Sequence, residues 1–422
     1  MHWNKINSIF KTSTFRQSLI TSTSIVANGV LATVFYLVAA RVLGAHEYGL
    51  FSLSAITIAI MSVVFDFGND KGMVKFVSSS GSDTPKGQQI LKAVFLTKLA
   101  SGIFFIFLFS YFSHPISILL YNQPEMARLL PMTAVAFFTQ LLFFFVTYYY
   151  QAREKFVMWG FLFINANLAR LILLFVIYHF DQLNAVSTLI LFALTPFISF
   201  IIGLRGMGWK FLQVKLQKTI FSELFSFNKW AFGFSSVSTV SSRLDTFLTS
   251  QLNTLQNVGI YSLASQATFI MPNLVSALGA VTSPKFARFN SPHENQKYLL
   301  KSTLFFFAIA LFCAVILIPL GYVFMRFSGL EYLAGFTPFI LLTLSQVLFL
   351  AFSPLRDSLL YYYSRPDFFF WASIGHGLVT LTSGLILMPQ IGLVGAAISN
   401  LAGQVFLSLV SSIMYLRLRE TK

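Results

Sequence analysis

Four ionisable side chains lie deep inside long apolar stretches of this sequence, and they carry most of the chemistry that it offers. Three are cations, Lys98, Arg170 and Arg243, and one is a carboxylate, Asp245. At the centre of a membrane helix each charge costs roughly 2.5–3.5 kcal/mol. These side chains are therefore expected to face protein or a water-filled cavity. Such a cavity would be cationic and would bind an anionic substrate, most naturally a phosphate-containing headgroup.

The spacing of these residues also predicts how they pair. Arg243 and Asp245 are two positions apart, so on one continuous helix they point to nearly opposite sides. Asp245 is therefore expected to pair with Lys98 or Arg170 rather than with Arg243. The alternative is that each cation is held by a single neighbour or by backbone carbonyls and serves packing alone.

Other polar side chains fall within the same apolar stretches and are candidates for lining the cavity. Amide groups there suit sugar hydroxyls, although hydrogen bonds between helices explain such residues equally well. A lone histidine is more often a packed residue than a ligand, and Asp66 is suited to capping a helix end. The candidates are Asn28, Asp66, Gln140, Asn165, His376 and Asn400.

Catalytic and metal-binding signatures are missing. The sequence contains no GxxxxGK[ST] loop, no HExxH and no GxSxG motif, and its six histidines are scattered without ligand spacing. The single cysteine, Cys313, lies in an apolar run and excludes an intrachain disulfide. We therefore expect no enzyme, no metal and no cofactor. Coupling to a gradient of protons or of another ion stays open.

The composition identifies the elements that must position these residues. Of 422 residues, 56% are hydrophobic and only 10% are charged, against about 25% charged in soluble proteins. We predict an all-α integral membrane protein with about 12 transmembrane helices. Their approximate ranges are 18–40, 49–66, 88–112, 130–150, 157–178, 185–204, 230–252, 256–283, 302–325, 333–353, 368–388 and 391–415.

The distribution of basic residues predicts the orientation. The chain carries 29 Lys and Arg against 14 Asp and Glu, a formal charge of +15. Most of the cations fall in the tails and in alternate loops, whereas the remaining loops hold only Arg41, Arg128 and Arg326. Cytoplasmic loops are enriched in Lys and Arg. Both termini are therefore expected in the cytoplasm, and membrane lipids rather than nucleic acid are the expected partners.

An internal repeat divides the chain into halves. Residues 48–61 (YGLFSLSAITIAIM) match residues 258–271 (VGIYSLASQATFIM) at an offset of 210, and a Tyr-triplet motif near 148–159 recurs near 361–371. We predict an N-terminal six-helix bundle over 1–208, a basic cytoplasmic linker over 209–229 and a C-terminal six-helix bundle over 230–422. Because the offset spans an even number of helices, the pseudo-twofold axis should run along the membrane normal.

The order of several motifs resembles a known family. The first hairpin carries Arg41-x-Leu-Gly, then Tyr48-Gly49, then Asp66-x-Gly; Arg243-x-Asp245 and the segment 391–399 (IGLVGAAIS) follow in the second half. The pattern resembles the polysaccharide-transporter branch (Wzx-like O-antigen flippases) of the multidrug/oligosaccharidyl-lipid/polysaccharide (MOP) exporter superfamily, over about residues 15–415. For site residues, the likeness carries over only to Arg243 and Asp245.

The resemblance implies a flippase that moves undecaprenyl-diphosphate-linked oligosaccharide across the bacterial inner membrane for O-antigen or capsule synthesis, alongside other polysaccharide-assembly proteins. The cationic cavity would take the diphosphate and the sugars by alternating access. The main alternative is a cation-coupled multidrug (MATE-type) antiporter of the same fold, although embedded cations would repel cationic drugs. A repeat-unit polymerase or ligase would need a large outer loop, which the predicted spans do not leave. A purely structural membrane protein is the remaining interpretation.

Overall fold

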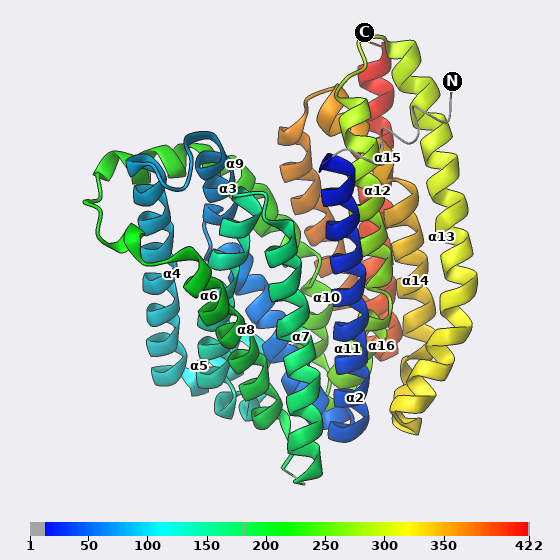
Figure 1. The fold of residues 1–422 in the computed structure, drawn as a ribbon. Coiled ribbons are helices and arrows are strands. Elements are labelled where there is room, and N and C mark those ends of the chain that lie inside the picture. The colour runs from blue at the N-terminus through cyan, green and yellow to red at the C-terminus, as the bar shows by residue number, and fades with distance from the viewer. Residues whose placement is uncertain (1–12, 181, 421–422) are drawn as a thin grey trace. The chain divides into compact units, whose positions relative to one another are not determined.

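The computed structural model describes residues 13–180 and 182–420, and this part of the chain is built from helices joined by short turns (Figure 1). The basic-tail residues Lys5 and Lys11, and Lys422 at the other end, lie outside the described residues. Eight of the described helices are long and apolar enough to cross a membrane. The predicted all-α membrane fold is confirmed.

The helices follow the predicted spans. In chain order their bounds are α2 Ser13–Val64, α3 Asn69–Ser80, α4 Pro85–Tyr111, α5 Ser113–Tyr121, α6 Leu130–Ala152, α7 Phe156–His179, α8 Ala185–Met207, α9 Lys218–Ser241, α10 Leu244–Leu252, α11 Leu255–Ala267, α12 Ile270–Phe286, α13 Pro292–Ser328, α14 Phe336–Ala351, α15 Ser353–Asp357 and α16 Pro366–Glu420. Short 3-10 turns lie at η1 Pro124–Arg128, η2 Lys210–Leu212 and η3 Leu330–Gly335, and a π turn at η4 Ser358–Tyr362.

Some spans are fused and others are broken. The first two predicted spans form the single helix α2, which bends at Gly44, where φ is 70°. The last two form α16, which bends at Ile391 and Gly392. The seventh and eighth spans are each built from two shorter helices, α9 with α10 and α11 with α12.

Local signals in the sequence explain where several helices begin. The Thr84 hydroxyl accepts a hydrogen bond from Gly87 N, and Pro85 occupies the first position of α4. Asn184 and Ser187 exchange side-chain and backbone hydrogen bonds at the start of α8, in a capping box. At the end of α8, Gly208 takes φ of 79°, a left-handed conformation that glycine adopts without steric cost.

The contacts divide the chain into two compact units. Unit 1 comprises residues 1–35, 57–113 and 127–232, and unit 2 comprises residues 36–56, 114–126 and 233–422. Helix α2 therefore contributes its central segment to unit 2 and its two ends to unit 1. The partition into two six-helix bundles joined by a linker stays a prediction.

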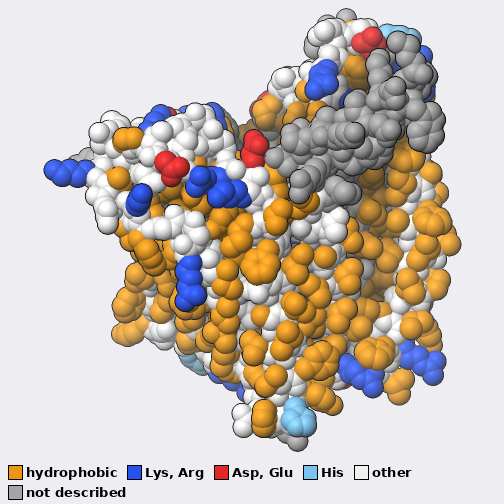
Figure 2. Space-filling view, in the orientation of Figure 1, with side chains coloured by type: hydrophobic (Ala, Val, Ile, Leu, Met, Phe, Trp, Pro, Cys, Tyr) orange, Lys and Arg blue, Asp and Glu red, His pale blue; other side chains and the backbone are white. Residues whose placement is uncertain are grey.

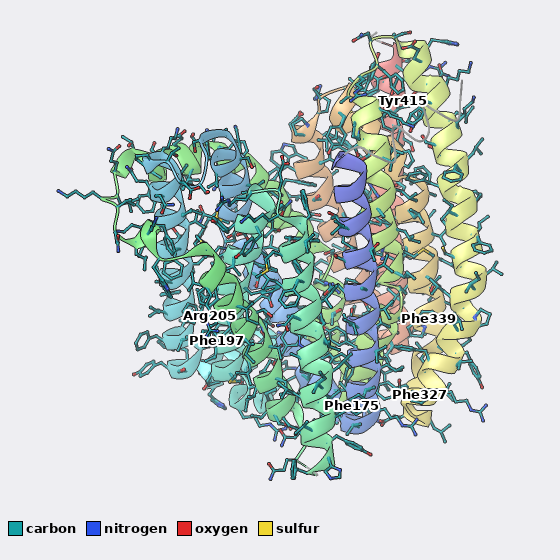
Figure 3. The ribbon with its side chains drawn as sticks, in the orientation of Figure 1. Phe175, Phe197, Arg205, Phe327, Phe339 and Tyr415 are labelled. Carbon is teal, nitrogen blue, oxygen red and sulfur yellow. The ribbon has the colours of Figure 1, made fainter. Side chains whose placement is uncertain are left out.

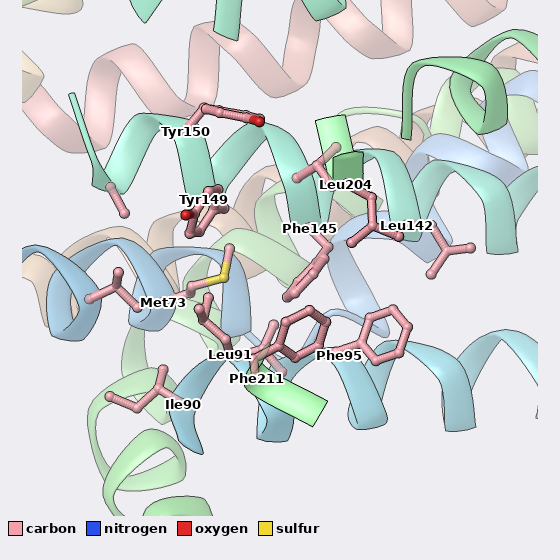
Figure 4. Packing of buried hydrophobic residues seen from close by; sticks show 14 of the residues in the cluster. Met73, Ile90, Leu91, Phe95, Leu142, Phe145, Tyr149, Tyr150, Leu204 and Phe211 are labelled. Carbon is pink, nitrogen blue, oxygen red and sulfur yellow. The ribbon is translucent and has the colours of Figure 1, made fainter. Parts of the chain in front are cut away.

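Each unit has its own apolar core. In unit 1, Phe95 of α4, Phe145 of α6 and Phe211 of η2 pack with ring centroids 5.2–5.6 Å apart (Figure 4). In unit 2, Met271 of α12 and Phe306 of α13 belong to a second cluster of buried residues. These cores fix the helices on which the polar side chains are carried.

The outer surfaces of the helices are apolar. On the face shown in Figure 2, hydrophobic side chains cover the sides of the helices, and most of the Lys and Arg side chains lie toward helix ends. Phe175, Phe197 and Phe327, labelled in Figure 3, are large exposed apolar side chains of this kind. In water such a surface would be unfavourable, whereas in a bilayer it meets lipid.

Candidate functional site

A break between two helices positions the motif Arg243-x-Asp245. Helix α9 ends at Ser241 and α10 begins at Leu244, with Arg243 between them at φ −124° and ψ 1°. Because the helix is interrupted here, the expectation that the two side chains point to opposite sides does not apply. Both residues line one cavity within unit 2.

The cavity has a volume of about 310 Å³ and a mixed polar and aromatic lining. It is lined by the α9–α10 junction, the α11–α12 junction, α14 and both halves of α16. Its lining residues include Ser238, Ser242, Arg243, Asp245, Phe269, Gln346, Phe349, His376, Asn400 and Gln404. Four of the residues predicted from the sequence therefore come together: Arg243, Asp245, His376 and Asn400.

The carboxylate of Asp245 is fully engaged by neutral donors. Its Oδ2 accepts hydrogen bonds from Tyr261 Oη at 2.6 Å and from Asn400 Nδ2 at 2.9 Å. Its Oδ1 accepts one from the Thr246 backbone N at 2.7 Å, and Thr246 Oγ1 lies at 3.3 Å. None of these donors is a cation. The predicted pairing of Asp245 with Lys98 or Arg170 is wrong.

Arg243 is held differently. Its guanidinium carbon lies 4.8 Å from the centroid of the Phe269 ring, a cation–π contact. Among the described residues it makes no ion pair with a carboxylate within 4 Å. The side chain is half-buried and lines the cavity. Arg243 therefore offers positive charge and several N–H donors to a ligand in this space.

His376 and Asn400 both belong to α16, on either side of its bend. Asn400 links two walls of the cavity, since its Oδ1 accepts from Ser345 Oγ at 2.7 Å while its Nδ2 donates to Asp245. His376 is buried. A side chain at Gly403 would come within 3.0 Å of His376 Nε2, so close packing inside α16 fixes the imidazole.

Arg170 lies in unit 1, on α7, in a pocket of aromatic rings and amides. Its guanidinium carbon is 3.9 Å from the Phe192 ring centroid, and its Nη1 donates to Asn167 Oδ1 at 3.2 Å. Asn167 Nδ2 in turn donates to Asn28 Oδ1. Of the predicted cavity residues in this unit, the structure thus joins Asn28 to Arg170.

Lys98 is fully buried in unit 1 and is enclosed by two carboxylates. Its Nζ lies 2.6 Å from Asp66 Oδ1 and 2.9 Å from Asp70 Oδ1. Asp66 also accepts a hydrogen bond at Oδ2 from Asp70 N at 3.0 Å, so it acts at the start of α3 as well. Sequence reasoning missed Asp70, because it falls in the loop predicted after the second span and is brought to Asp66 by the turn at Phe67 and Gly68.

The two remaining candidates lie apart from these clusters. Asn165 Nδ2 donates to Ser199 Oγ at 3.0 Å, a link between α7 and α8. Gln140 is half-buried on α6. Sequence reasoning also missed Tyr261, whose hydroxyl holds Asp245, because a tyrosine in an apolar stretch carries no spacing signal of its own.

A family comparison decides what kind of chain this is. Residues 15–290, more than half of the chain, match the family described as polysaccharide biosynthesis protein. The chain belongs to this family. Among curated proteins, no sequence matches. The residues that match the polysaccharide biosynthesis family include the motifs Arg41-x-Leu-Gly, Asp66-x-Gly and Arg243-x-Asp245.

Solved structures place this polysaccharide biosynthesis protein in the fold of the MOP superfamily. It is similar to "Lipid II flippase MurJ, inward closed conformation", with 17% identity and a TM-score of 0.76 over 94% of this chain and 87% of that one. An inward-facing MATE multidrug transporter of the MOP superfamily is 10% identical, with a TM-score of 0.75 over 95% of this chain and 98% of that one. The Vibrio cholerae MATE transporter VcmN, in its bent form, is 15% identical, with a TM-score of 0.63 over 96% of this chain and 97% of that one. The predicted fold is confirmed, and the protein is an integral membrane protein with the fold that these flippase and transporter structures share.

Proposed function

We propose that this protein is a flippase for undecaprenyl-diphosphate-linked oligosaccharide in the bacterial inner membrane, with both termini in the cytoplasm. The observation that carries the proposal is which of the two charged residues in the unit 2 cavity, Arg243 and Asp245, is already bound by neighbouring side chains. Arg243 has no carboxylate partner among the described residues, whereas Asp245 already accepts bonds from Tyr261, Asn400 and Thr246. The charge available to a substrate is therefore positive.

The rest of the lining suits a glycan. Serine, asparagine and glutamine side chains supply donors and acceptors for sugar hydroxyls, and Phe269 and Phe349 supply flat apolar faces. We assign Arg243 to the diphosphate, and Asn400, which bonds to Ser345 and Asp245, holds the cavity wall in place. Arg170 and Asn28 form a second candidate contact with the substrate, in unit 1. Lys98 is bound by Asp66 and Asp70 and does not contact the substrate directly. The substrate enters by alternating access of the two halves.

The alternative is a MATE-type antiporter for cationic drugs, which the similarity of fold supports equally. A cationic drug would need an accessible carboxylate. Asp245 is only 3% exposed and its oxygens are occupied. A drug cation would also meet the guanidinium of Arg243 in the same space. The charge arrangement therefore favours an anionic substrate.

The test is an Arg243→Ala variant of the full-length protein, compared with Arg326→Ala, which removes an exposed arginine of α13 in the same unit. Each variant is expressed at matched membrane levels in the source bacterium with its chromosomal gene deleted, and surface polysaccharide is quantified. We expect loss of surface glycan for Arg243→Ala and normal glycan for Arg326→Ala. Normal glycan from both variants would contradict the proposal.

A binding measurement separates the two candidate functions. Loss of a charge-assisted hydrogen bond costs about 1.5–3 kcal/mol, or about 10- to 100-fold in affinity. We expect Arg243→Ala to weaken binding of undecaprenyl diphosphate to the purified protein by this factor. Ethidium serves as the cationic probe. Tight ethidium binding that Arg243→Ala leaves unchanged or strengthens would favour the antiporter.

A further inference from the structure

Unit 1 contains a cluster of three charged side chains that are nearly inaccessible to solvent. Asp66, Asp70 and Lys98 are 5%, 7% and 0% exposed. Lys98 Nζ contacts one oxygen of each carboxylate, at 2.6 and 2.9 Å. With both carboxylates ionised, two negative charges face one positive charge, and the cluster carries a net charge of −1. Burying an uncompensated charge is costly unless the group binds a counter-charge or is neutralised.

The backbone brings the two carboxylates together through a tight turn. Phe67 and Gly68 both adopt positive φ, 54° and 73°, between the end of α2 and the start of α3. This turn lets Asp70 N donate to Asp66 Oδ2 at 3.0 Å. Opposite the turn, Ser101 Oγ of α4 donates to Phe65 O at 3.2 Å. This bond holds α4, the helix that carries Lys98, against the turn.

The two carboxylates are not equivalent. Both oxygens of Asp66 accept hydrogen bonds, one from Lys98 Nζ and one from Asp70 N. For Asp70, the ion pair with Lys98 is the contact seen among the described residues, and its buried Oδ1 makes no hydrogen bond of good geometry there. Asp70 is therefore the carboxylate that would accept a proton.

Lys98 is the cation that acts on Asp70, whereas the other groups around the cluster are neutral or act on Asp66. From α6, Tyr148 is close enough to both carboxylates to interact electrostatically, but it is neutral. From α9, the amide of Asn228 bonds to Asn69 Oδ1 at 3.3 Å, and its own Oδ1 has no hydrogen-bond partner among the described residues. Lys71 interacts electrostatically with Asp66 but points to the exposed face of α3.

We propose that the Asp66–Lys98–Asp70 cluster is a proton-binding site, with Asp70 as the residue that takes up and releases one proton. Asp70 lies in α3, a helix of 12 residues that is too short to cross a membrane by itself. There, burial and the neighbouring Asp66 carboxylate raise the pKa of Asp70 above its ordinary value. A proton taken from water neutralises the cluster, and its release restores the net charge of −1.

The proton has a mechanical consequence that rests on the proposed transport function. A neutral Asp70 no longer attracts the Lys98 ammonium, which weakens the contact between α3 and α4 while Asp66 keeps its hold on Lys98. Asp66 lies in the turn that follows α2, the helix that contributes residues 36–56 to unit 2. Binding and release of the proton would therefore weaken and restore the contact between α3 and α4, at the turn that follows α2.

The test is a titration of the full-length protein in lipid nanodiscs with ¹³C-carboxyl aspartate, followed by NMR. The chain has seven aspartates, and single Asp→Asn variants assign the signals. We expect one signal, lost in Asp70→Asn, with a midpoint more than about one pH unit above that of the exposed Asp83. Asp367, an exposed carboxylate that pairs with Arg365, provides a second internal reference.

Two further variants keep the proposal falsifiable. Asp66→Asn removes the like charge and leaves Asp70 paired with Lys98, so the high midpoint should fall by about one pH unit or more. Arg243→Ala should leave the titration unchanged, which separates this site from failure of the proposed transport function. Titration of Asp70 together with Asp83, or a midpoint insensitive to Asp66→Asn, would overturn the proposal.

Discussion

Gly49 and Gly259, which occupy equivalent positions of the internal repeat, pack against each other's helices in a reciprocal contact within unit 2. A Cβ atom at Gly49 would lie 2.1 Å from Leu255 O, and a Cβ atom at Gly259 would lie 2.0 Å from Ala45 O. Ala45 and Leu255 are also repeat equivalents, since both pairs differ by 210 positions. Reciprocal contacts of this kind are what a local twofold axis between two segments produces.

The reciprocal contact predicts that two substitutions have matching effects. Neither helix can accept a side chain at these glycines without moving its backbone, and overpacking costs about 1–3 kcal/mol. We expect Gly49→Ala and Gly259→Ala to lower the thermal stability of the detergent-purified protein by similar amounts. Gly279→Ala is the control, because its Cβ would meet no atom closer than 3.8 Å. Equal stability of all three variants would contradict the contact.

Removal of Lys98 should expose the cost of two buried carboxylates. Removing one partner of a buried ion pair destabilises a protein by about 3–5 kcal/mol, and we expect this loss for Lys98→Met at neutral pH. Protonation at lower pH would neutralise the carboxylates, so the deficit relative to the unsubstituted protein should shrink as the pH falls. Thermal unfolding at several pH values measures this.

A surface ion pair provides the control for Lys98. Lys86 Nζ lies 2.7 Å from Glu223 Oε1, but both side chains are more than one third exposed. Pairs of this kind contribute about 0–1 kcal/mol. Lys86→Met should therefore change stability little at any pH. A Lys98→Met deficit that grows toward low pH would show that the carboxylates do not carry the buried charge.

The contact between Arg170 and Phe192 predicts that lysine cannot replace this arginine. A guanidinium stacks on a ring and donates in a plane, whereas an ammonium is a compact charge. We expect Arg170→Lys to lose most of the effect of the contact, and a double-mutant cycle with Phe192→Leu to give a coupling energy of about 0.5–2 kcal/mol. Thermal unfolding of the four proteins supplies the cycle. A coupling energy of zero would remove the assigned cation–π contact.

Tyr261 is predicted to support Asp245. Its hydroxyl donates to Asp245 Oδ2 at 2.6 Å in a buried setting, and hydrogen bonds to charged groups contribute about 1.5–3 kcal/mol. Tyr261→Phe should lower stability by this amount. Tyr322→Phe, at an exposed position on α13, should not. If the two variants unfold alike, the bond does not stabilise the carboxylate.

The sequence was sufficient for most of the fold because the apolar runs are long and uninterrupted. Each predicted span falls on helical residues of the described chain, and the repeat found at Gly49 and Gly259 is a physical contact. The break in the seventh span was not predicted. The interruption at Ser242 and Arg243 leaves hydropathy unchanged, because a membrane helix and two half-helices have the same composition.

The partners of the charged residues were harder to predict than their depth. The cost of burial correctly indicated that Lys98, Arg170 and Asp245 face protein, but it cannot say which neighbour satisfies each charge. Lys98 binds Asp66, at the end of the second predicted span, and Asp70, which falls in the loop predicted after it. Asp245 is satisfied by a phenol and an amide, groups that carry no charge signal.

The assignment of residues 36–56 to unit 2 has a consequence for biosynthesis. Gly49 finds its packing partner only when residues near Leu255 have been translated, about 200 residues later. At ribosomal rates of about 5–20 residues per second, this delay is about 10–40 seconds. During that time the first hairpin must wait in the membrane without its native neighbour, so insertion factors that shelter unpaired helices would act at this stage.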